Sequence, residues 1–232
     1  MKFEVKVLEI IKRTHDAKSF RFPRPESFDY KPGQYILVSL TVEGSMVTKP
    51  LSISSSPTDK NYIEFTKKLT GHPFSNVLDN MKIGDSAVIS GPSGKMTFEG
   101  EYKKVVLLSG GIGITPMMSI CKYCTDMHID SNIVLIYSNK TENDLAFKTE
   151  FEEMMHSNSN LKIVYTLTRA SESWTGLRER ISNKLIINEV PDYMERRFYI
   201  CGPPDMVNSM EETLASMNIP KEMVKKESLV GY

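Results

Sequence analysis

The sequence lacks the marks of several common classes of protein. No run of about 18 apolar residues occurs, so we expect no membrane-spanning helix. The 29 basic and 29 acidic residues cancel, which argues against a nucleic-acid partner bound through bulk charge. The three cysteines cannot close a disulfide framework without leaving one over, and the N-terminus has no apolar stretch of signal-peptide type. We therefore expect a cytoplasmic protein in a reducing compartment, with a monomer as the default state.

Short strands separated by glycine and proline turns fill the first hundred residues. Phe3, Val5 and Val7 alternate with charged residues, and residues 35–38 form an apolar strand after a Pro-Gly turn. One helix is expected near residues 75–81. Many short strands with such punctuation predict a small antiparallel β-barrel or sandwich.

The pattern changes after the polar segment 99–104, where we place a domain boundary that gives domains 1–100 and 101–232. Continuous apolar strands now alternate with helical stretches, which predicts right-handed βαβ units and a parallel sheet. The expected strands are 105–108, 133–137, 161–165 and 198–201, and the expected helices begin near 116, 147 and 205.

The first chemical motif is the glycine-rich loop at residues 109–116, which follows a buried strand and opens a helix. Its glycines let the backbone approach a ligand closely, Thr115 can cap the helix, and Pro116 suits its first turn. The free N–H groups of such a helix start favour a phosphate. The loop is not the G-x-G-x-x-G fingerprint, so a tight turn without a ligand is the alternative.

A second loop, Cys201-Gly202-Pro203-Pro204, also lies between an apolar strand and a helix. In a parallel sheet both loops lie at the carboxyl ends of their strands, on one edge, which favours a ligand crevice between them. For Cys201 the alternative is a small thiol buried in the core.

Two weaker signals lie in the first half. Lys49 stands beside a run of serine hydroxyls at 52 and 54–56, a combination that suits a phosphate or a polar ring edge. Residues 71–75 precede the expected helix and form a second possible anion site. The first signal alone is weak, because serine-rich turns are usually ordinary turns.

Six motifs in this order resemble the ferredoxin–NAD(P) reductase family over nearly the whole chain. That family has a barrel domain that binds FAD and a parallel α/β domain that binds NAD(P)H. The matching segments are Lys31–Tyr35, Lys49–Ser52, Gly71–Ser75, Gly91–Gly94, Gly110–Pro116 and Cys201–Pro204.

The resemblance implies specific flavin contacts. Ser52 corresponds to the residue at the flavin N5/O4 edge. Lys49 replaces the family's arginine on the FAD diphosphate and keeps its charge, but it loses the bidentate hydrogen bonding of a guanidinium group. Leu51 replaces the family's tyrosine on the flavin ring and loses aromatic stacking. For Lys67 and Lys68 the alternative to a flavin contact is a position on a solvated strand edge. The implied FAD-binding set is Lys49, Pro50, Leu51, Ser52, Ile53, Thr66, Lys67, Lys68, Gly71, Phe74, Ser75 and Asn76.

The resemblance also implies a nucleotide site in the second half. Cys201 corresponds to the cysteine beside the nicotinamide, and the C-terminus resembles the family's acidic-then-aromatic tail. Ser52, Cys201, Glu227 and Tyr232 are therefore the expected catalytic set, with Tyr232 covering the flavin unless it is a frayed terminus. The implied nucleotide contacts are Gly110, Gly111, Gly113, Ile114, Thr115, Pro116, Cys201, Gly202 and Pro203.

The basic residues after the third strand of the second half bear on the choice of nucleotide. The 2′-phosphate of NADPH needs cations and hydroxyls, and the expected group is Thr168, Arg169, Arg178 and Arg180, with Lys140 as a lesser candidate. No acidic residue directly follows that strand to bind an adenosine ribose. This favours NADPH over NADH, although solvated arginines are the simpler alternative.

Metal chemistry has no support in the sequence. The four histidines are scattered, and Cys121 and Cys124 lie inside an expected helix rather than at its start. Three cysteines cannot supply the four thiolates of an ordinary iron–sulfur cluster, so a built-in ferredoxin domain is excluded.

The resulting expectation is an FAD-dependent NAD(P)H oxidoreductase. Hydride would pass from nicotinamide to flavin, and electrons would leave to a separate acceptor. This acceptor is a small redox protein of ferredoxin or flavodoxin type, an oxygenase component, or a small molecule such as a ferric chelate or a quinone, and the sequence does not identify which. One alternative is an electron-transfer subunit that is inactive without its complex, motivated by Lys49 and Leu51. Another is a nucleotide-binding protein that no longer binds flavin.

Overall fold

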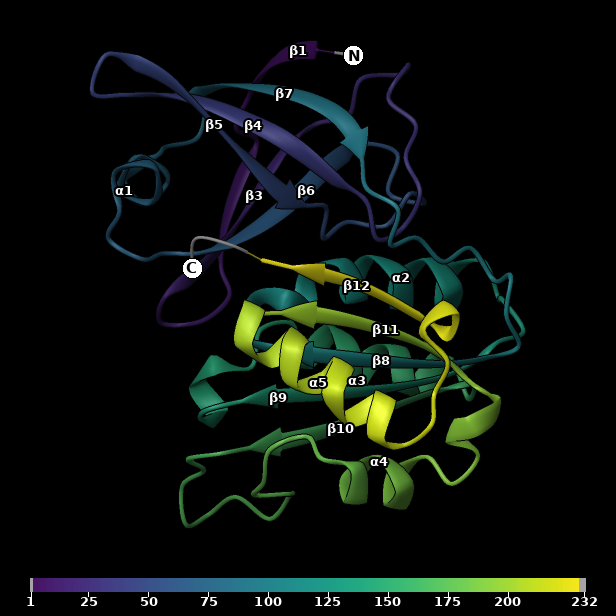
Figure 1. Cartoon of the computed structure of the whole chain (residues 1–232). Coiled ribbons are helices and arrows are strands. Elements are labelled where there is room, and N and C mark those ends of the chain that lie inside the picture. Colours follow the sequence, from purple (N-terminus) through teal and green to yellow (C-terminus); the bar gives the residue numbers. More distant parts are fainter. Residues whose placement is uncertain (1, 230–232) are drawn as a thin grey trace.

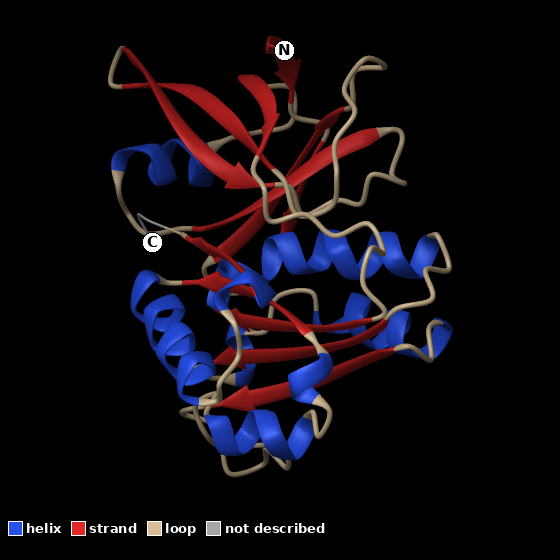
Figure 2. Ribbon diagram, turned by 45° about the vertical axis from the view of Figure 1, so that its right-hand side comes forward, coloured by secondary structure: helices blue, strands red, loops and turns tan. Residues whose placement is uncertain are grey.

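The structure, a computed structural model, describes residues 2–229 and stacks two layers of strands and helices (Figure 1). The N-terminal strands form the upper layer, and a five-stranded sheet with its helices forms the lower one. The second helix, α2 (Ile114–Asp126), lies between the two layers in both ribbon views (Figures 1 and 2). None of the described helices has the length and apolar character needed to cross a membrane.

The N-terminal half consists of two antiparallel sheets. One has the order β1-β7-β4-β5 and the other β2-β3-β6, and a bridge between Ile53 and Phe65 joins them. Their facing sides pack around a core that includes Phe20, Ile36 and Phe65. The predicted antiparallel β fold of this half is confirmed. The strands are β1 (Lys2–Lys6), β2 (Glu9–Lys12), β3 (Ala17–Pro23), β4 (Tyr35–Val42), β5 (Ser45–Ser52), β6 (Tyr62–Lys68) and β7 (Ser86–Ser93), and the helix is α1 (Pro73–Asn80).

The C-terminal half is built on a fully parallel sheet with the order β10-β9-β8-β11-β12, as predicted. Helices α2 and α3 pack on one face, and α4 and α5 pack on the other. Strands that are covered on both faces explain the continuous apolar runs of the sequence. The remaining elements are β8 (Lys104–Gly110), β9 (Asn132–Asn139), α3 (Lys148–Ser157), β10 (Leu161–Leu167), α4 (Asn183–Glu189), β11 (Arg197–Gly202), α5 (Pro204–Ser216) and β12 (Val224–Ser228), with short 3₁₀ turns at 111–113, 142–144, 193–195 and 221–223.

Two elements depart from the sequence-based expectation. Helix α4 was not expected, and the segment read as a tail is the edge strand β12, which pairs in parallel with β11. Glu227 therefore lies within a sheet rather than on a terminus.

Candidate functional site

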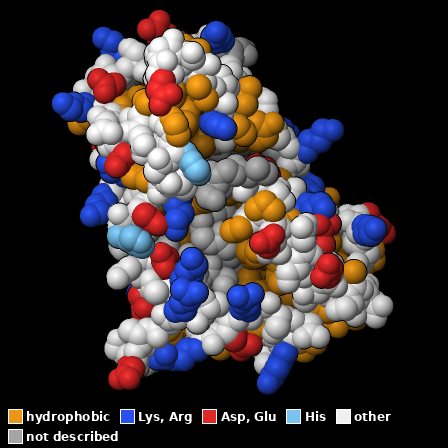
Figure 3. Space-filling view, turned by 60° about the vertical axis from the view of Figure 1, so that its left-hand side comes forward, with side chains coloured by type: hydrophobic (Ala, Val, Ile, Leu, Met, Phe, Trp, Pro, Cys, Tyr) orange, Lys and Arg blue, Asp and Glu red, His pale blue; other side chains and the backbone are white. Residues whose placement is uncertain are grey.

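A cavity of about 610 Å³ opens between the two halves at the carboxyl edge of the parallel sheet. Its floor comes from the loops after β8, β9 and β11, including Gly110, Asn139 and Pro203. Thr14 and Lys68 line it from the N-terminal half. Figure 3 views this side of the molecule, where Lys and Arg side chains gather on the lower half. Ligands of open α/β sheets bind at such an edge.

The two glycine loops predicted to share this edge are in contact. A Cβ atom added to Gly113 would lie 2.2 Å from the carbonyl oxygen of Cys201 and 2.7 Å from the Cα of Gly202. Gly111 has φ +53 and faces open space. The tight contact requires glycine at 113, and the open position at 111 leaves room for a ligand beside the backbone.

The start of α2 differs from the prediction. The helix begins at Ile114, so Thr115 and Pro116 lie in its first turn and Gly113 occupies the cap position. The expectation that Thr115 caps the helix is wrong, because its hydroxyl donates to the carbonyl of Ile112 at 3.1 Å. The helix start therefore has no side-chain cap, and the backbone N–H of Ile114 donates to the carbonyls of Gly111 and Ile112 in the preceding 3₁₀ turn.

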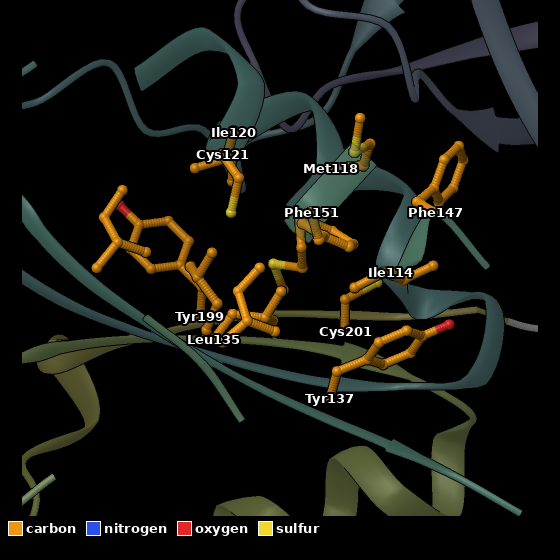
Figure 4. Packing of buried hydrophobic residues seen from close by; sticks show 14 of the residues in the cluster. Ile114, Met118, Ile120, Cys121, Leu135, Tyr137, Phe147, Phe151, Tyr199 and Cys201 are labelled. Atoms are coloured by element: carbon orange, nitrogen blue, oxygen red, sulfur yellow. The ribbon is translucent and has the colours of Figure 1, made fainter. Parts of the chain in front are cut away.

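Cys201 on β11 and Glu227 on β12 are paired neighbours in the parallel sheet. Cys201 is fully buried beside Ile114 and Tyr137 in one apolar cluster (Figure 4). Burial, followed by the charge of Glu227, raises the pKa of the Cys201 thiol well above its usual value. Burial also raises the pKa of Glu227 to about 7. The thiol is therefore a neutral group of the core with no exposed surface, whereas the carboxyl group changes charge near neutral pH.

Met206 is a cavity residue that the sequence analysis missed. A Cβ atom built on Gly110 would lie 2.3 Å from the Met206 sulfur, and one built on Gly202 would lie 2.8 Å from it. Its side chain thus packs against both glycine loops and lines the cavity. The sequence offers one signal for Met206, which is its position two residues after the Cys201–Pro204 loop.

On the N-terminal side, Ser52 is buried at the end of β5, and its hydroxyl has no hydrogen-bond partner within the described chain. Burying an unpaired hydroxyl is unfavourable, so its orientation fits a polar group of a ligand. Tyr35, which the sequence analysis also missed, lies directly opposite Ser52 on β4 and is half-buried.

Three lysines concentrate positive charge on β5 and β6. Lys67 is 6% exposed, and burial, followed by the charges of Lys49 and Lys68, lowers its pKa to about 8. Lys68 also pairs with Asp16 at 2.7 Å. Cations that depress the pKa of a neighbour in this way favour an anion between them. The donor set therefore fits the FAD diphosphate.

Leu51 contributes less than the resemblance implies. It is 2% exposed and belongs to the N-terminal core, whereas Lys49 and Pro50 are exposed. A side chain enclosed in this way offers little surface to a flavin ring. Ile53 is likewise core, with 0% exposure.

The turn before α1 is held by its own side chains. The Ser75 hydroxyl accepts a hydrogen bond from the backbone N–H of Thr70 at 2.8 Å, and the Asn76 amide donates to the carbonyl of Gly71 at 2.9 Å. Phe74 is buried beneath the turn. The Thr66 hydroxyl is committed inward, at 2.6 Å from that of Ser19. The Ser75 and Thr66 hydroxyls, and the backbone groups of Thr70 and Gly71, are therefore engaged within the fold.

A smaller cavity of about 330 Å³ lies at the ends of β9 and β10, lined by Lys140, Thr168, Arg169, Arg178, Glu179 and Arg180. Arg178 stabilises the loop after β10, because its guanidinium donates hydrogen bonds to the carbonyls of Ala170, Ser171, Glu172 and Trp174. Lys140, Arg169 and Arg180 are exposed and form no ion pair within residues 2–229. These three cations are the ones available to an anion.

Pro203 is exposed and directly precedes α5. Cys121 and Cys124 are buried free thiols of α2 whose pKa values are raised by burial. Tyr232 lies outside the described residues.

Models of two protein families match the chain. An oxidoreductase FAD-binding domain matches residues 4–98, and an oxidoreductase NAD-binding domain matches residues 107–212. NADH-cytochrome b5 reductase 2 of Danio rerio is 30% identical, covering 100% of this chain and 84% of the relative. The glycine betaine monooxygenase reductase subunit of Chromohalobacter salexigens is 30% identical over 97% of this chain, but the chain spans only 63% of that relative.

Solved structures agree on the fold. The ferredoxin NADP+ reductase from Neisseria gonorrhoeae superposes with a TM-score of 0.84 at 24% identity, covering 98% of both chains. The flavohem-like FAD/NAD-binding domain of nitric oxide dioxygenase from Vibrio cholerae gives 0.87 at 23% identity, covering 97% of this chain and 98% of that one. The chain therefore belongs to the ferredoxin–NAD(P) reductase family of FAD- and NAD-binding oxidoreductases.

Proposed function

We propose that this chain takes hydride from NADPH at the cavity between its halves and passes the electrons to a separate redox protein. When bound, FAD supplies the redox chemistry by accepting an electron pair and releasing electrons singly or in a pair. The two functional halves divide within residues 99–104, and the protein acts in the cytoplasm.

Each side of the cavity has a distinct part in this proposal. Ser52 donates to the flavin edge, and Lys49 and Lys67 hold the FAD diphosphate. The glycine turn 110–112 before α2 and the 201–203 loop hold the nucleotide. Cys201 supports the nicotinamide pocket from within the core, while Glu227 supplies a negative charge as hydride leaves and positive charge develops on that ring.

The observation that carries the preference for NADPH is the group Lys140, Arg169 and Arg180 around the small cavity. Cations without an acidic partner are the natural ligands of a 2′-phosphate. The relatives named NADH-cytochrome b5 reductases make NADH the competing candidate. Their names, and that of the monooxygenase reductase subunit, favour a haem protein or an oxygenase component as the acceptor.

The test is steady-state turnover of the FAD-loaded chain with an artificial one-electron acceptor and either nucleotide. We expect kcat/KM to be at least tenfold higher for NADPH than for NADH. A higher value for NADH contradicts the nucleotide assignment and leaves the reductase assignment standing.

The same assay addresses a second candidate, an electron-transfer subunit that is inactive without its complex. The enclosed Leu51 favours it, because its side chain offers little surface to a flavin ring. Lys49 also favours it, because it holds the diphosphate without the two-pronged fork of the arginine that it replaces. Turnover by the isolated chain argues against this candidate. Tight FAD retention without turnover supports it.

A further inference from the structure

Arg13 joins the two halves of the molecule through a single buried side chain. It lies in the turn between β2 and β3 and is only 10% exposed. Its guanidinium donates to Glu64 at 3.1 Å and to the Ser19 hydroxyl at 2.6 Å, both in the N-terminal half. It also pairs with Glu150 of α3, 137 positions along the chain.

The N-terminal end of this contact is fixed. Glu64 is 3% exposed and also accepts hydrogen bonds from Arg21 and from the Ser54 hydroxyl, each at 2.8 Å. Ser54 follows the flavin-edge residue Ser52 by two positions, and Glu64 lies on β6, which ends in the lysines proposed for the diphosphate. Arg13 is therefore attached directly to the strands of the proposed flavin site.

The C-terminal end is fixed as well. The guanidinium carbon of Arg13 lies 4.5 Å from the ring centre of Phe147, the residue just before α3. Phe147 has φ +62, which is rare for a bulky side chain and persists only where the surroundings determine it. It is 3% exposed and belongs to the same apolar cluster as Ile114 and Met118 at the start of α2 (Figure 4).

Both ends of the contact border the large cavity. Thr14, Asp16 and Ala17, which follow Arg13, line its wall, as do Asp144 and Ala146, which precede Phe147. Arg13 thus lies where the wall from one half meets the wall from the other. An arginine suits this position, because its planar fork can serve several acceptors at once while stacking on a ring.

We propose that Arg13 is a positioning residue that fixes the separation of the two cofactor sites by clamping the 13–17 turn to the start of α3. The inference rests on the proposed function. Hydride transfer depends steeply on the distance between the reacting atoms, so a small relaxation of this clamp slows the transfer without removing any group that binds a cofactor.

The test compares Glu150→Gln and Arg13→Lys with the control Glu153→Gln, which changes an exposed glutamate of the same helix that forms no ion pair within the described chain. Rapid mixing with saturating NADPH or NADH gives the rate of flavin reduction, and equilibrium titration gives the affinities for FAD and nucleotide. Amide hydrogen exchange without nucleotide reports on residues 14–17 and 147–151.

We expect both clamp variants to reduce flavin at least fivefold more slowly, with both affinities within twofold of the wild type. Exchange should rise at both segments, and Glu153→Gln should change nothing. Wild-type reduction rates in both clamp variants overturn the proposal, as does a loss of rate explained by lost FAD. If neither nucleotide reduces the flavin of the wild type, the proposed function fails. The amide hydrogen exchange then tests the contact of Arg13 with Glu150 by itself, and unchanged exchange in both variants overturns it.

Discussion

Cys201 and Glu227 lie side by side at the carboxyl edge of the parallel sheet, on the paired strands β11 and β12. Burial keeps the thiol neutral and brings the pKa of the carboxyl group to about 7. The pair thus places a neutral, buried thiol beside a carboxyl group whose charge changes with pH near 7.

The rate of flavin reduction by NADPH should therefore rise as pH increases through about 7, because the Glu227 carboxylate stabilises the positive charge that develops on the nicotinamide. Glu227→Gln should lower the high-pH plateau and remove this inflection. Rapid-mixing measurements between pH 5.5 and 8.5 test this. The control Glu222→Gln, at an exposed site nearby, should keep the inflection.

Glu227 also makes the free energy of unfolding depend on pH. Its folded pKa is raised, so between the ordinary value of 4.5 and about 7 the folded state binds more protons than the unfolded state. Its contribution to the free energy of unfolding therefore falls as pH rises through this window. Urea titrations should show that Glu227→Gln gains stability relative to wild type from pH 5 to pH 7. A constant difference would show that Glu227 is not buried as described.

Ser52→Ala should separate stability from cofactor binding. The hydroxyl has no partner in the described chain, so its removal should leave the melting temperature of the FAD-free protein unchanged or raised. FAD affinity should fall about three- to tenfold, the value of one hydrogen bond. Ser54→Ala is the contrasting variant, because its hydroxyl bonds Glu64 and Thr66, and it should destabilise the FAD-free protein. Unchanged FAD affinity in Ser52→Ala would remove Ser52 from the flavin site.

Arg169→Ala should raise the KM for NADPH about ten- to a hundredfold and leave that for NADH nearly unchanged, because one charge-assisted contact to the 2′-phosphate is lost. Arg178→Ala is the matched control. Its guanidinium braces the carbonyls of residues 170–174, so it should lower the melting temperature more than it changes selectivity. Equal effects of Arg169→Ala on both nucleotides would contradict its role.

Gly113→Ala should destabilise the fold more than Gly111→Ala. At 113 the backbone is helical, with φ −59, and the penalty comes from a collision with the Cys201 carbonyl. At 111 the space is open, and only the positive φ is unfavourable, by about 1 kcal/mol. Overpacking at 113 should reduce the free energy of unfolding by about 1–3 kcal/mol. Denaturant titration of both variants measures the difference, and an equal or smaller loss at 113 would refute the contact.

Local patterns in the sequence predicted much of the architecture. Continuous apolar strands followed by glycine loops predict a parallel sheet and place the loops after β8 and β11 on one edge, where Gly113 and Cys201 do touch. Strand β12 was missed because Val224-Lys225-Lys226-Glu227-Ser228 is mostly charged, as an edge strand permits. Helix α4 was missed because its seven residues carry little periodic signal.

Tertiary contacts account for the other differences. A lone arginine in a loop looks the same in sequence whether it binds phosphate or braces carbonyls, and only the structure separates Arg178 from Arg169. The family position of Leu51 implied a contact surface, yet its side chain turns into the core. The contact between Arg13 and Glu150 spans 137 positions and has no local signature.

The most direct test of the account is an anaerobic titration of the FAD-loaded protein with NADPH and, separately, with NADH, followed by flavin absorbance. We predict that one equivalent of NADPH bleaches the flavin fully, and that NADH does so more slowly. A protein that retains no FAD, or whose flavin neither nucleotide bleaches, would contradict the assignment of the cavity as a site of hydride transfer.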